Sequence, residues 1–333
     1  MSFVDKILQR KSVSIVGLAK NAGKTEVLNY VLREASARGC GRCIAVTSIG
    51  LDGESVDRVS HTPKPEIEIY EGMIFATSET HYRQKRLVAE VLEVGARETA
   101  LGRVVTARAL STGKVMLSGP PDTESLRGLI GGLGRFGVQT TVVDGALSRL
   151  SHGSPAVTEG LVLVTGAAVS GNIPMLVRET KYVYDRVQLE AVSPLIYSLL
   201  AHMDSGVWAI DEQQCVHDLE VESVLVPTEK NILRHGNTIY VAGAVGDRLL
   251  EELRMQKQAV TLIIRDFTRI FATPENYYAF LAGGGCIRVL LKSELLAVCS
   301  NPVSPKGFSL DAEALVAALE HGLDVAVYDV KRM

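Results

Sequence analysis

The residues best suited to chemistry lie near the start of the sequence, at residues 17–25, which read GLAKNAGKT. A short apolar run precedes them and a helix-like run follows, so a glycine-rich turn would point backbone N–H groups and the positive end of a helix at one anion. Lys24 could then reach the outer phosphates of a nucleotide, and the Thr25 hydroxyl could ligate Mg²⁺. The segment therefore predicts a phosphate-binding loop. The alternative is a strand-to-helix turn that contains the Gly-Lys-Thr sequence by chance and binds no phosphate.

The glycine spacing of this loop is one residue longer than its common form. Five residues separate Gly17 from Gly23, whereas the common form has four in that interval. Gly23 lets the backbone approach a phosphate closely because it has no Cβ atom. We expect Lys24 to act in catalysis as well as in binding. The expected nucleotide contacts are Gly17, Asn21, Ala22, Gly23, Lys24, Thr25 and Glu26.

Two acidic residues follow other expected strands and could complete the site. Asp144 ends the apolar run TTVV, where a carboxylate is costly unless a cation or hydrogen-bond donors receive it. Asp52 lies in the loop TSIGLDGE, directly after a second expected strand. We expect Asp52 and Asp144 to hold Mg²⁺ together with Thr25, and Asp52 or Glu54 to orient the attacking water. A polar turn is the alternative for both aspartates, because Asp-Gly is a common turn pair, and a helix N-cap is a second alternative for Asp144.

Several segments spread over nearly the whole chain resemble one known family. They are GLAKNAGKT, TSIGLDGESVD, VVDGALSRLSHGSP, LVTGAAVS and NPVSPKGFSLDAEALVAAL. The longer loop resembles that of the dethiobiotin synthetase and cobyrinic-acid amidase group of P-loop proteins. The whole set is similar to the ATPase subunit of the lysine 5,6-aminomutase reactivating factor.

That resemblance implies a P-loop NTPase that uses ATP and Mg²⁺. Its partners would be an adenosylcobalamin-dependent aminomutase and a MutS-like companion subunit, and it would release damaged cobalamin at the expense of ATP. No D-x-H-x-x-G string occurs in the sequence, so we expect a partner that uses nucleotide energy rather than a cobalamin carrier.

Two other functions stay open at this point. One is an ATP-dependent carboxylate-activating enzyme of the dethiobiotin type, but those enzymes carry Lys-Pro directly after the second strand. This chain has Ser48-Ile49-Gly50 there, and its nearest Lys-Pro is Lys64-Pro65. The other is a nucleotide-sensing interaction module that binds without turnover.

Two further motifs are interpreted as ordinary structure. The C-x-x-C at residues 40–43 has no second ligand pair for zinc and lies in an expected helix-to-strand turn. The G-x-G-x-x-G at residues 132–137 follows an expected helix and precedes an expected strand. That order is the reverse of the dinucleotide-binding fingerprint, so it predicts a helix-ending turn.

Composition and charge exclude several classes of protein. The 333 residues include 35 Lys and Arg against 38 Asp and Glu, a net charge of −3, which gives no basic face for nucleic acid. No apolar run reaches the length of about 20 residues that spans a bilayer, and the first residues, MSFVDKILQRKS, lack a signal-peptide core. We therefore expect a cytoplasmic protein with reduced thiols, no nucleic-acid or membrane partner, and a homodimer as one option.

Alternating strands and helices must position these residues. The expected strands of the first part are 11–16, 43–48, 139–143 and 161–165, and its expected helices are 25–38, 122–135 and 173–192. Such alternation is typical of βαβ units in a mostly parallel sheet. Short antiparallel strands interrupt it at about 66–119, with a helix expected around 83–93. The expected fold is α/β: a P-loop NTPase domain at residues 1–204 with an insertion at about 60–120, then a C-terminal α/β domain or extension at 205–333.

Overall fold

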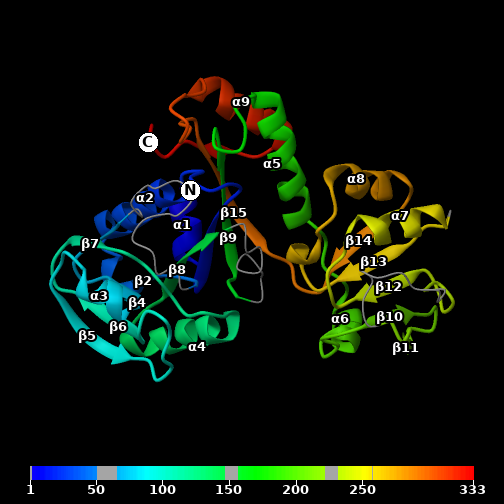
Figure 1. Ribbon diagram of the computed structural model, residues 1–333, viewed down its shortest axis with the longest axis horizontal. Helices are drawn as coiled ribbons and strands as arrows, with labels where there is room; N and C mark the ends of the chain where they lie inside the picture. The colour runs from blue at the N-terminus through cyan, green and yellow to red at the C-terminus, as the bar shows by residue number, and fades with distance from the viewer. Residues whose placement is uncertain (1, 51–65, 147–156, 222–231, 257) are drawn as a thin grey trace. The chain divides into compact units, whose positions relative to one another are not determined.

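The computed structural model in Figure 1 describes residues 2–50, 66–146, 157–221, 232–256 and 258–333. The chain divides into two compact units. The first comprises Met1–Lys181 and Leu295–Met333, and the second comprises Tyr182–Glu294. Within the described ranges, no helix combines the length and the apolar character that crossing a membrane requires.

A nine-stranded sheet forms the centre of the first unit, in the order β16-β15-β9-β1-β8-β2-β4-β6-β5. Its interior is parallel: β1 pairs with β8 and β9, β8 with β2, and β2 with β4. The bounds of these strands are β1 Ser12–Gly17, β2 Ile44–Ser48, β4 Ile74–Ser78, β8 Thr140–Ala146, β9 Gly160–Gly166, β15 Glu294–Asn301 and β16 Val327–Tyr328. The expected α/β class with a large, mostly parallel sheet is confirmed.

Helices cover both faces of this sheet, which explains why β1 is buried along its whole length. Val13 and Val142 pack with α1 (Phe3–Leu8) and α2 (Lys24–Ala37) in the largest core cluster. The next residue of β8, Val143, packs instead with α4 (Thr123–Leu133). Because successive strand residues point to opposite faces, α2 and α4 lie on opposite sides of the sheet (Figure 1).

One edge of the sheet is antiparallel, within the part of the chain where an insertion is expected. There β6 (Val104–Ala109) pairs antiparallel with both β4 and β5 (Ala89–Val94). The helix expected around 83–93 is wrong, because α3 (Glu79–Arg83) ends where that helix was to begin. Hydrogen bonding to β6 fixes the following valine-rich run as a strand, which outweighs its local helical pattern. The short strands β3 (Ile67–Ile69) and β7 (Gly113–Val115) form a separate two-stranded sheet.

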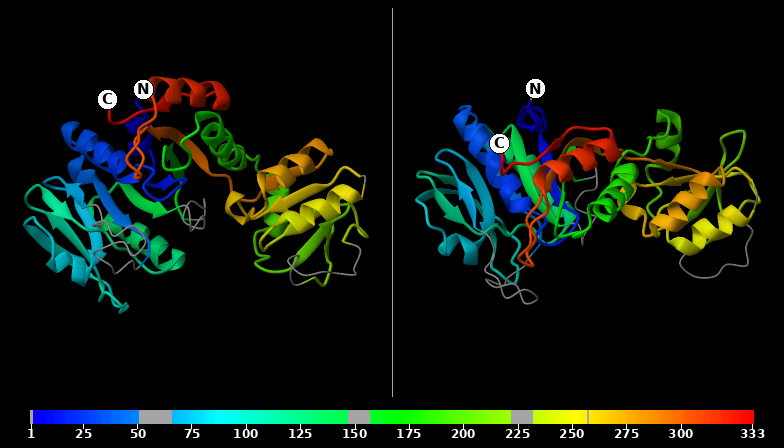
Figure 2. Two further views of the ribbon diagram at one scale, coloured as in Figure 1. Left: turned by 45° about the horizontal axis from the view of Figure 1, so that its top comes forward. Right: turned by 90° about the horizontal axis from the view of Figure 1, so that it is seen from above.

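The last segment of the first unit returns to the main sheet through β15 and β16, with α9 (Ala312–Leu323) between them. In both views of Figure 2, α9 lies beside α5 (Ile173–Val187). The two helices pack so closely that a Cβ atom on Gly322 would lie 2.5 Å from Val177 Cγ1.

A smaller sheet organises the second unit, in the order β11-β10-β12-β13-β14. The last three strands of that order are parallel, and β10 is antiparallel to both of its neighbours. Helices α7 and α8 pack on one face, and α6 packs on the other. The bounds are α6 Pro194–Leu200, β10 Val207–Ile210, β11 Val216–Asp218, β12 Thr238–Val241, α7 Asp247–Met255, β13 Thr261–Ile264, α8 Pro274–Ala282 and β14 Cys286–Val289.

This division differs from the expected boundary at residue 204. The second unit begins at Tyr182, inside α5, and ends at Glu294. The span 205–333 is therefore split between two units, because residues 295–333 belong to the first. An alternation of strands and helices along the chain does not tell which sheet each strand joins.

Candidate functional site

The glycine-rich segment joins the end of β1 to the start of α2, at the carboxyl edge of the parallel sheet. The strands on either side of β1 are β8 and β9. After β8 the chain therefore passes to the other side of β1 before it forms β9. Ligands of open α/β sheets bind outside the carboxyl ends of the strands at such a change of direction. The fold thus places residues 18–23 where a ligand is expected.

The turn itself uses two residues in the left-handed region of backbone space. Asn21 has a φ of 61° and Gly23 a φ of 105°, which asparagine tolerates and glycine adopts freely. The Leu18 N–H donates to the Val164 carbonyl of β9 over 2.8 Å, and the Ala22 N–H donates to the Ala19 carbonyl over 3.3 Å. These bonds fold the loop over the end of β1.

Helix α2 begins without a side-chain cap. Its N-cap residue is Gly23, which makes no side-chain capping hydrogen bond. Side chains of Ser2, Asp122 and Asp311 cap α1, α4 and α9 in the same unit. The first N–H groups of a helix have no partner within the helix, so an uncapped end suits an external anion.

The Lys24 side chain folds back over the end of β1 toward β8. Its Nζ donates to the Gly145 carbonyl over 2.7 Å and lies 3.5 Å from Asp144 Oδ1. A Cβ atom on Gly17 would lie only 2.8 Å from Lys24 Cγ. The first glycine of the motif therefore makes room for the stem of this lysine.

Asp144 lies at the site through the register of the parallel sheet. It is opposite Ile15 of β1 and Ser48 of β2, and the Ser48 hydroxyl donates to the Asp144 carbonyl over 3.2 Å. Among the described residues, Asp144 Oδ1 is buried and accepts no hydrogen bond. That oxygen is a suitable ligand for a cation.

The residues present fit Mg²⁺ better than a metal held by protein alone. In the described parts of the chain, no three His, Cys, Asp or Glu side chains gather closely enough to hold a metal ion. Mg²⁺ typically takes only one or two carboxylates and completes its shell with phosphate oxygens and water. Asp144 supplies one such carboxylate, and Thr25, the second residue of α2, is the hydroxyl expected beside it.

The other expected site residues are placed as follows. Ala22 is buried in the turn. Glu26 is exposed on α2, and its Oε1 lies 3.9 Å from Lys331 Nζ. Asp52 and Glu54 lie outside the described residues.

The structure also brings in Asn301, which the sequence did not single out. A Cβ atom on Gly23 would lie 2.9 Å from Asn301 Nδ2, and one on Gly166 would lie 2.0 Å from the Asn301 carbonyl oxygen. The Ala167 N–H donates to that carbonyl over 2.9 Å, and Asn301 Oδ1 accepts from Val303 N–H over 3.1 Å. The ends of β9 and β15 therefore pack against the turn at residues 18–23 through one asparagine.

The sequence contains only weak indications that Asn301, Gly145 and Ser48 belong to the site. Asn301 directly precedes a proline, and Gly145 and Ser48 lie at or near the ends of expected strands. Nothing local in the sequence places residue 301 beside residue 23. The contact depends on strand order.

No family model matches the chain, and neither a curated protein nor a solved structure matches it. What the loop can bind follows from its own geometry.

Proposed function

We propose that the chain is a Mg²⁺-dependent P-loop nucleoside triphosphatase that binds ATP. The observation that carries this proposal is the open amino end of α2. It has a glycine N-cap with no side-chain acceptor, and Lys24 is turned back toward Asp144 and the Gly145 carbonyl. Backbone donors, a helix dipole and one ammonium group thus meet at the carboxyl edge of the sheet, as triphosphate binding requires.

Each residue has a distinct role in this proposal. The N–H groups of the turn and of the first turn of α2 would bind phosphate oxygens, and Lys24 would stabilise the negative charge that develops on the transferred phosphoryl group. Thr25 and Asp144 would hold Mg²⁺, which neutralises phosphate charge when it is bound. Asp52 would orient the attacking water. Catalysis would then consist mainly of positioning and charge stabilisation.

Nucleotide binding and phosphate release by Lys24→Ala test the proposal. Removing one positioned charge-stabilising group typically costs about 100-fold or more in rate, so hydrolysis should fall by at least that factor. Lys20→Ala is a matched control, because Lys20 is exposed in the same loop and should keep activity near the wild-type level. If Lys24→Ala hydrolyses ATP at the wild-type rate, the proposed role of Lys24 in catalysis is wrong. Tight ATP binding by the wild type without phosphate release, even with partners, would favour the nucleotide-sensing module instead.

On the sequence resemblance, we propose that this turnover serves an adenosylcobalamin-dependent aminomutase of the lysine 5,6-aminomutase type, with a MutS-like companion subunit. The supporting segments are the glycine-rich loop, the segment TSIGLDGESVD and the regions around Asp144, Gly166 and Asn301. Purified protein and companion, given ATP, should restore an inactivated aminomutase, and Lys24→Ala should not. ATP turnover that depends on a small organic acid and forms a phosphorylated intermediate would indicate the dethiobiotin-type activity.

A further inference from the structure

A row of hydroxyl groups follows the carboxyl edge of the main sheet, beside the candidate nucleotide site. The neighbouring strands β2 and β4 end in the same pair of residues, Thr47-Ser48 and Thr77-Ser78. The Ser48 hydroxyl donates to the Asp144 carbonyl of β8, and the Thr47 hydroxyl donates to a carbonyl of β4 over 3.1 Å. The row therefore connects β4 with the strand that carries Asp144.

The row ends at His81 of α3, a buried histidine whose exposed fraction is 2%. Its Nδ1 lies 2.9 Å from Ser118 Oγ, and Ser118 Oγ donates to Ser78 Oγ over 2.8 Å. Because a hydroxyl has one hydrogen atom, the imidazole Nδ1–H is the donor to Ser118 in this arrangement. The Ser78 N–H donates to Ser118 Oγ, and the Ser118 N–H donates to Thr77 Oγ1, each over 3.1 Å. Ser118 is thus bonded to His81 and to both residues that end β4.

The segment of residues 116–121, which connects β7 to α4, packs against the end of β2. A Cβ atom on Gly119 would lie only 1.5 Å from the Ser48 carbonyl oxygen, so glycine is needed for this close approach. The Gly50 N–H donates to the Pro120 carbonyl over 2.9 Å. This connecting segment therefore holds the backbone from Ser48 to Gly50.

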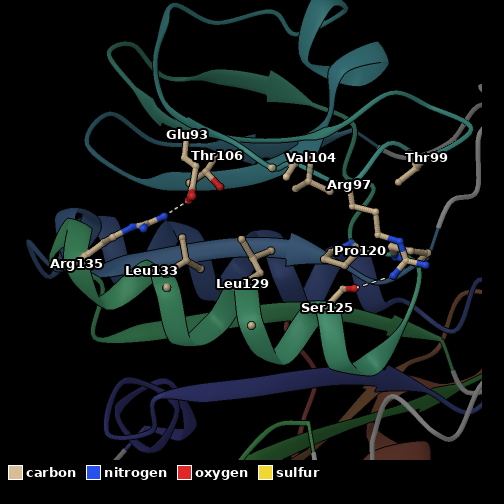
Figure 3. Close-up of a pocket in the computed structure, with 15 residues that line it drawn as sticks. Glu93, Arg97, Thr99, Val104, Thr106, Pro120, Ser125, Leu129, Leu133 and Arg135 are labelled. Carbon is tan, nitrogen blue, oxygen red and sulfur yellow. Dashed lines mark hydrogen bonds and ion pairs between the residues drawn. The ribbon is translucent and has the colours of Figure 1, made fainter.

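Packing holds the connecting segment less firmly on its other side. Pro120 and Pro121 line a cavity of about 370 Å³ between α4 and the strands β5 and β6, and Figure 3 shows Pro120 near the amino end of α4. The cavity leaves this side of the segment with few van der Waals partners among the described residues. The hydrogen bonds of Ser118 therefore contribute much of what fixes the segment.

We propose that His81 is a positioning residue of the ATPase site, an inference that rests on the proposed function. Through Ser118 it holds the connecting segment against Ser48, and Ser48 in turn holds the Asp144 carbonyl. Without this bond the segment can shift into the cavity, and the Asp144 carboxylate is then less well oriented toward Mg²⁺. Lys24 and the turn before it lie on β1 and α2, so ATP binding itself should depend little on His81.

Steady-state ATP hydrolysis by His81→Leu and His81→Asn tests the proposal. Leucine fills the space without a donor, and losing a partner that orients a metal ligand should lower kcat about tenfold. The affinity for ATP without Mg²⁺ should stay within about twofold of the wild type, since turnover and binding respond separately. Asparagine keeps an N–H group near the position of Nδ1 and should restore kcat to within about threefold.

Thr158→Val is the matched control for the loss of a buried hydrogen bond. The Thr158 hydroxyl donates to Ser14 Oγ over 2.9 Å, just before the start of β9. This variant should also lower the midpoint of urea denaturation, because it leaves a buried polar group without its partner, but kcat should stay within about twofold of the wild type. Equal losses of kcat in Thr158→Val and His81→Leu, or a wild-type kcat in His81→Leu, would overturn the positioning role.

Hydrogen exchange at Gly50 separates this inference from the proposed function. Because the Gly50 N–H is bonded to the Pro120 carbonyl, its exchange should be about tenfold faster in His81→Leu and unchanged in Thr158→Val. A wild type that does not hydrolyse ATP would overturn the proposed function. Unchanged exchange at Gly50 in His81→Leu would overturn the role of His81, whatever the activity.

Discussion

The amino ends of α2 and α7 show how one local arrangement can be open or closed to a ligand. Each helix follows a strand with at least one parallel neighbour, β1 or β12, and each has a glycine N-cap without a side-chain hydrogen bond. In α7 the next residue is Asp247, whose Oδ1 accepts hydrogen bonds from the N–H and the hydroxyl of Thr273 over 2.6 and 2.9 Å. In α2 the next residue is Lys24.

The first helical residue therefore decides what the end of the helix can receive. In α7 the protein itself supplies a carboxylate at the positive end of the helix dipole. In α2 the first residue is a lysine, and the chain places no carboxylate side chain as a cap at that end of the helix; the proposed nucleotide would supply the anion there. Glycine-rich turns alone do not make a phosphate site, since both turns contain glycine.

The strongest test transfers the α7 residue into α2. Lys24→Asp would place a carboxylate at the open helix end and next to Asp144, and both effects repel a triphosphate. We expect Mg²⁺–ATP affinity, measured by calorimetry, to fall at least about 100-fold, which is about 2.7 kcal/mol. Lys20→Asp changes the net charge equally and should lower affinity only slightly. Equal losses in the two variants would show that overall charge, not the first residue of α2, determines binding.

The substitutions Gly23→Ala and Gly39→Ala test whether Asn301 fixes the backbone of the turn before α2. Gly23 and Gly39 both have positive φ, 105° and 72°, but only Gly23 has Asn301 against the position of an added Cβ atom. Denaturant titration should show a loss of about 1–2 kcal/mol for Gly39→Ala from backbone strain. Gly23→Ala should lose about 1–3 kcal/mol more, because Asn301 must shift. Equal losses would mean that Asn301 does not fix the turn.

The role of the half-buried Asp144 carboxylate is tested by Asp144→Asn, which keeps the shape and removes the charge. If Asp144 holds Mg²⁺, the Mg²⁺ concentration that half-saturates the effect on ATP affinity should rise about tenfold or more. Chelating Mg²⁺ should weaken ATP binding strongly in the wild type and only slightly in the variant. A variant with the wild-type response to Mg²⁺ would assign the metal to other residues.

The smallest effect is expected from a substitution of Asp247 at the amino end of α7. Burial opposes ionisation of Asp247, but hydrogen bonds from Thr273 and Asn276 outweigh it and hold the pKa of this carboxyl below its usual range. The stabilisation is therefore complete above the usual carboxyl pKa, near about 4, and disappears as the pH falls through the lowered value.

Asp247→Asn should reduce the free energy of unfolding at neutral pH by at most about 1 kcal/mol, because the group is partly solvated. That difference should shrink below about pH 4, and ATP affinity should not change. A stability difference that grows in acid would contradict the direction of this pKa shift.

The strand, turn and helix around the glycine-rich loop were predicted well, because they follow one another directly in the sequence. The strand expected at 11–16 and the helix expected at 25–38 match β1 and α2 within one residue at each end. The position of Asp144 near a strand end also matches, since a carboxylate in an apolar run stands out. Its role in binding Mg²⁺ stays a prediction.

Contacts between distant segments were not predictable in the same way. Gly17 makes room for the stem of Lys24, which the sequence did not indicate, and its expected contact with phosphate stays a prediction. That role depends on the direction in which one side chain folds. The strand β5 was expected to be helical, because its partner β6 cannot be identified from the run itself. Asn301 was missed because its contact with Gly23 requires β15 to join the first sheet.

The return of β15 also sets when the site can form during synthesis on the ribosome. Residues 182–294 are continuous, so the second unit can fold as soon as it has emerged. The turn at residues 18–23 is made before the second unit, yet Asn301, which packs against it, is made after that unit. The turn at residues 18–23 therefore lacks its packing partner on β15 until the whole second unit has been translated. The packing of this turn against Asn301 is therefore completed only after translation has passed residue 301.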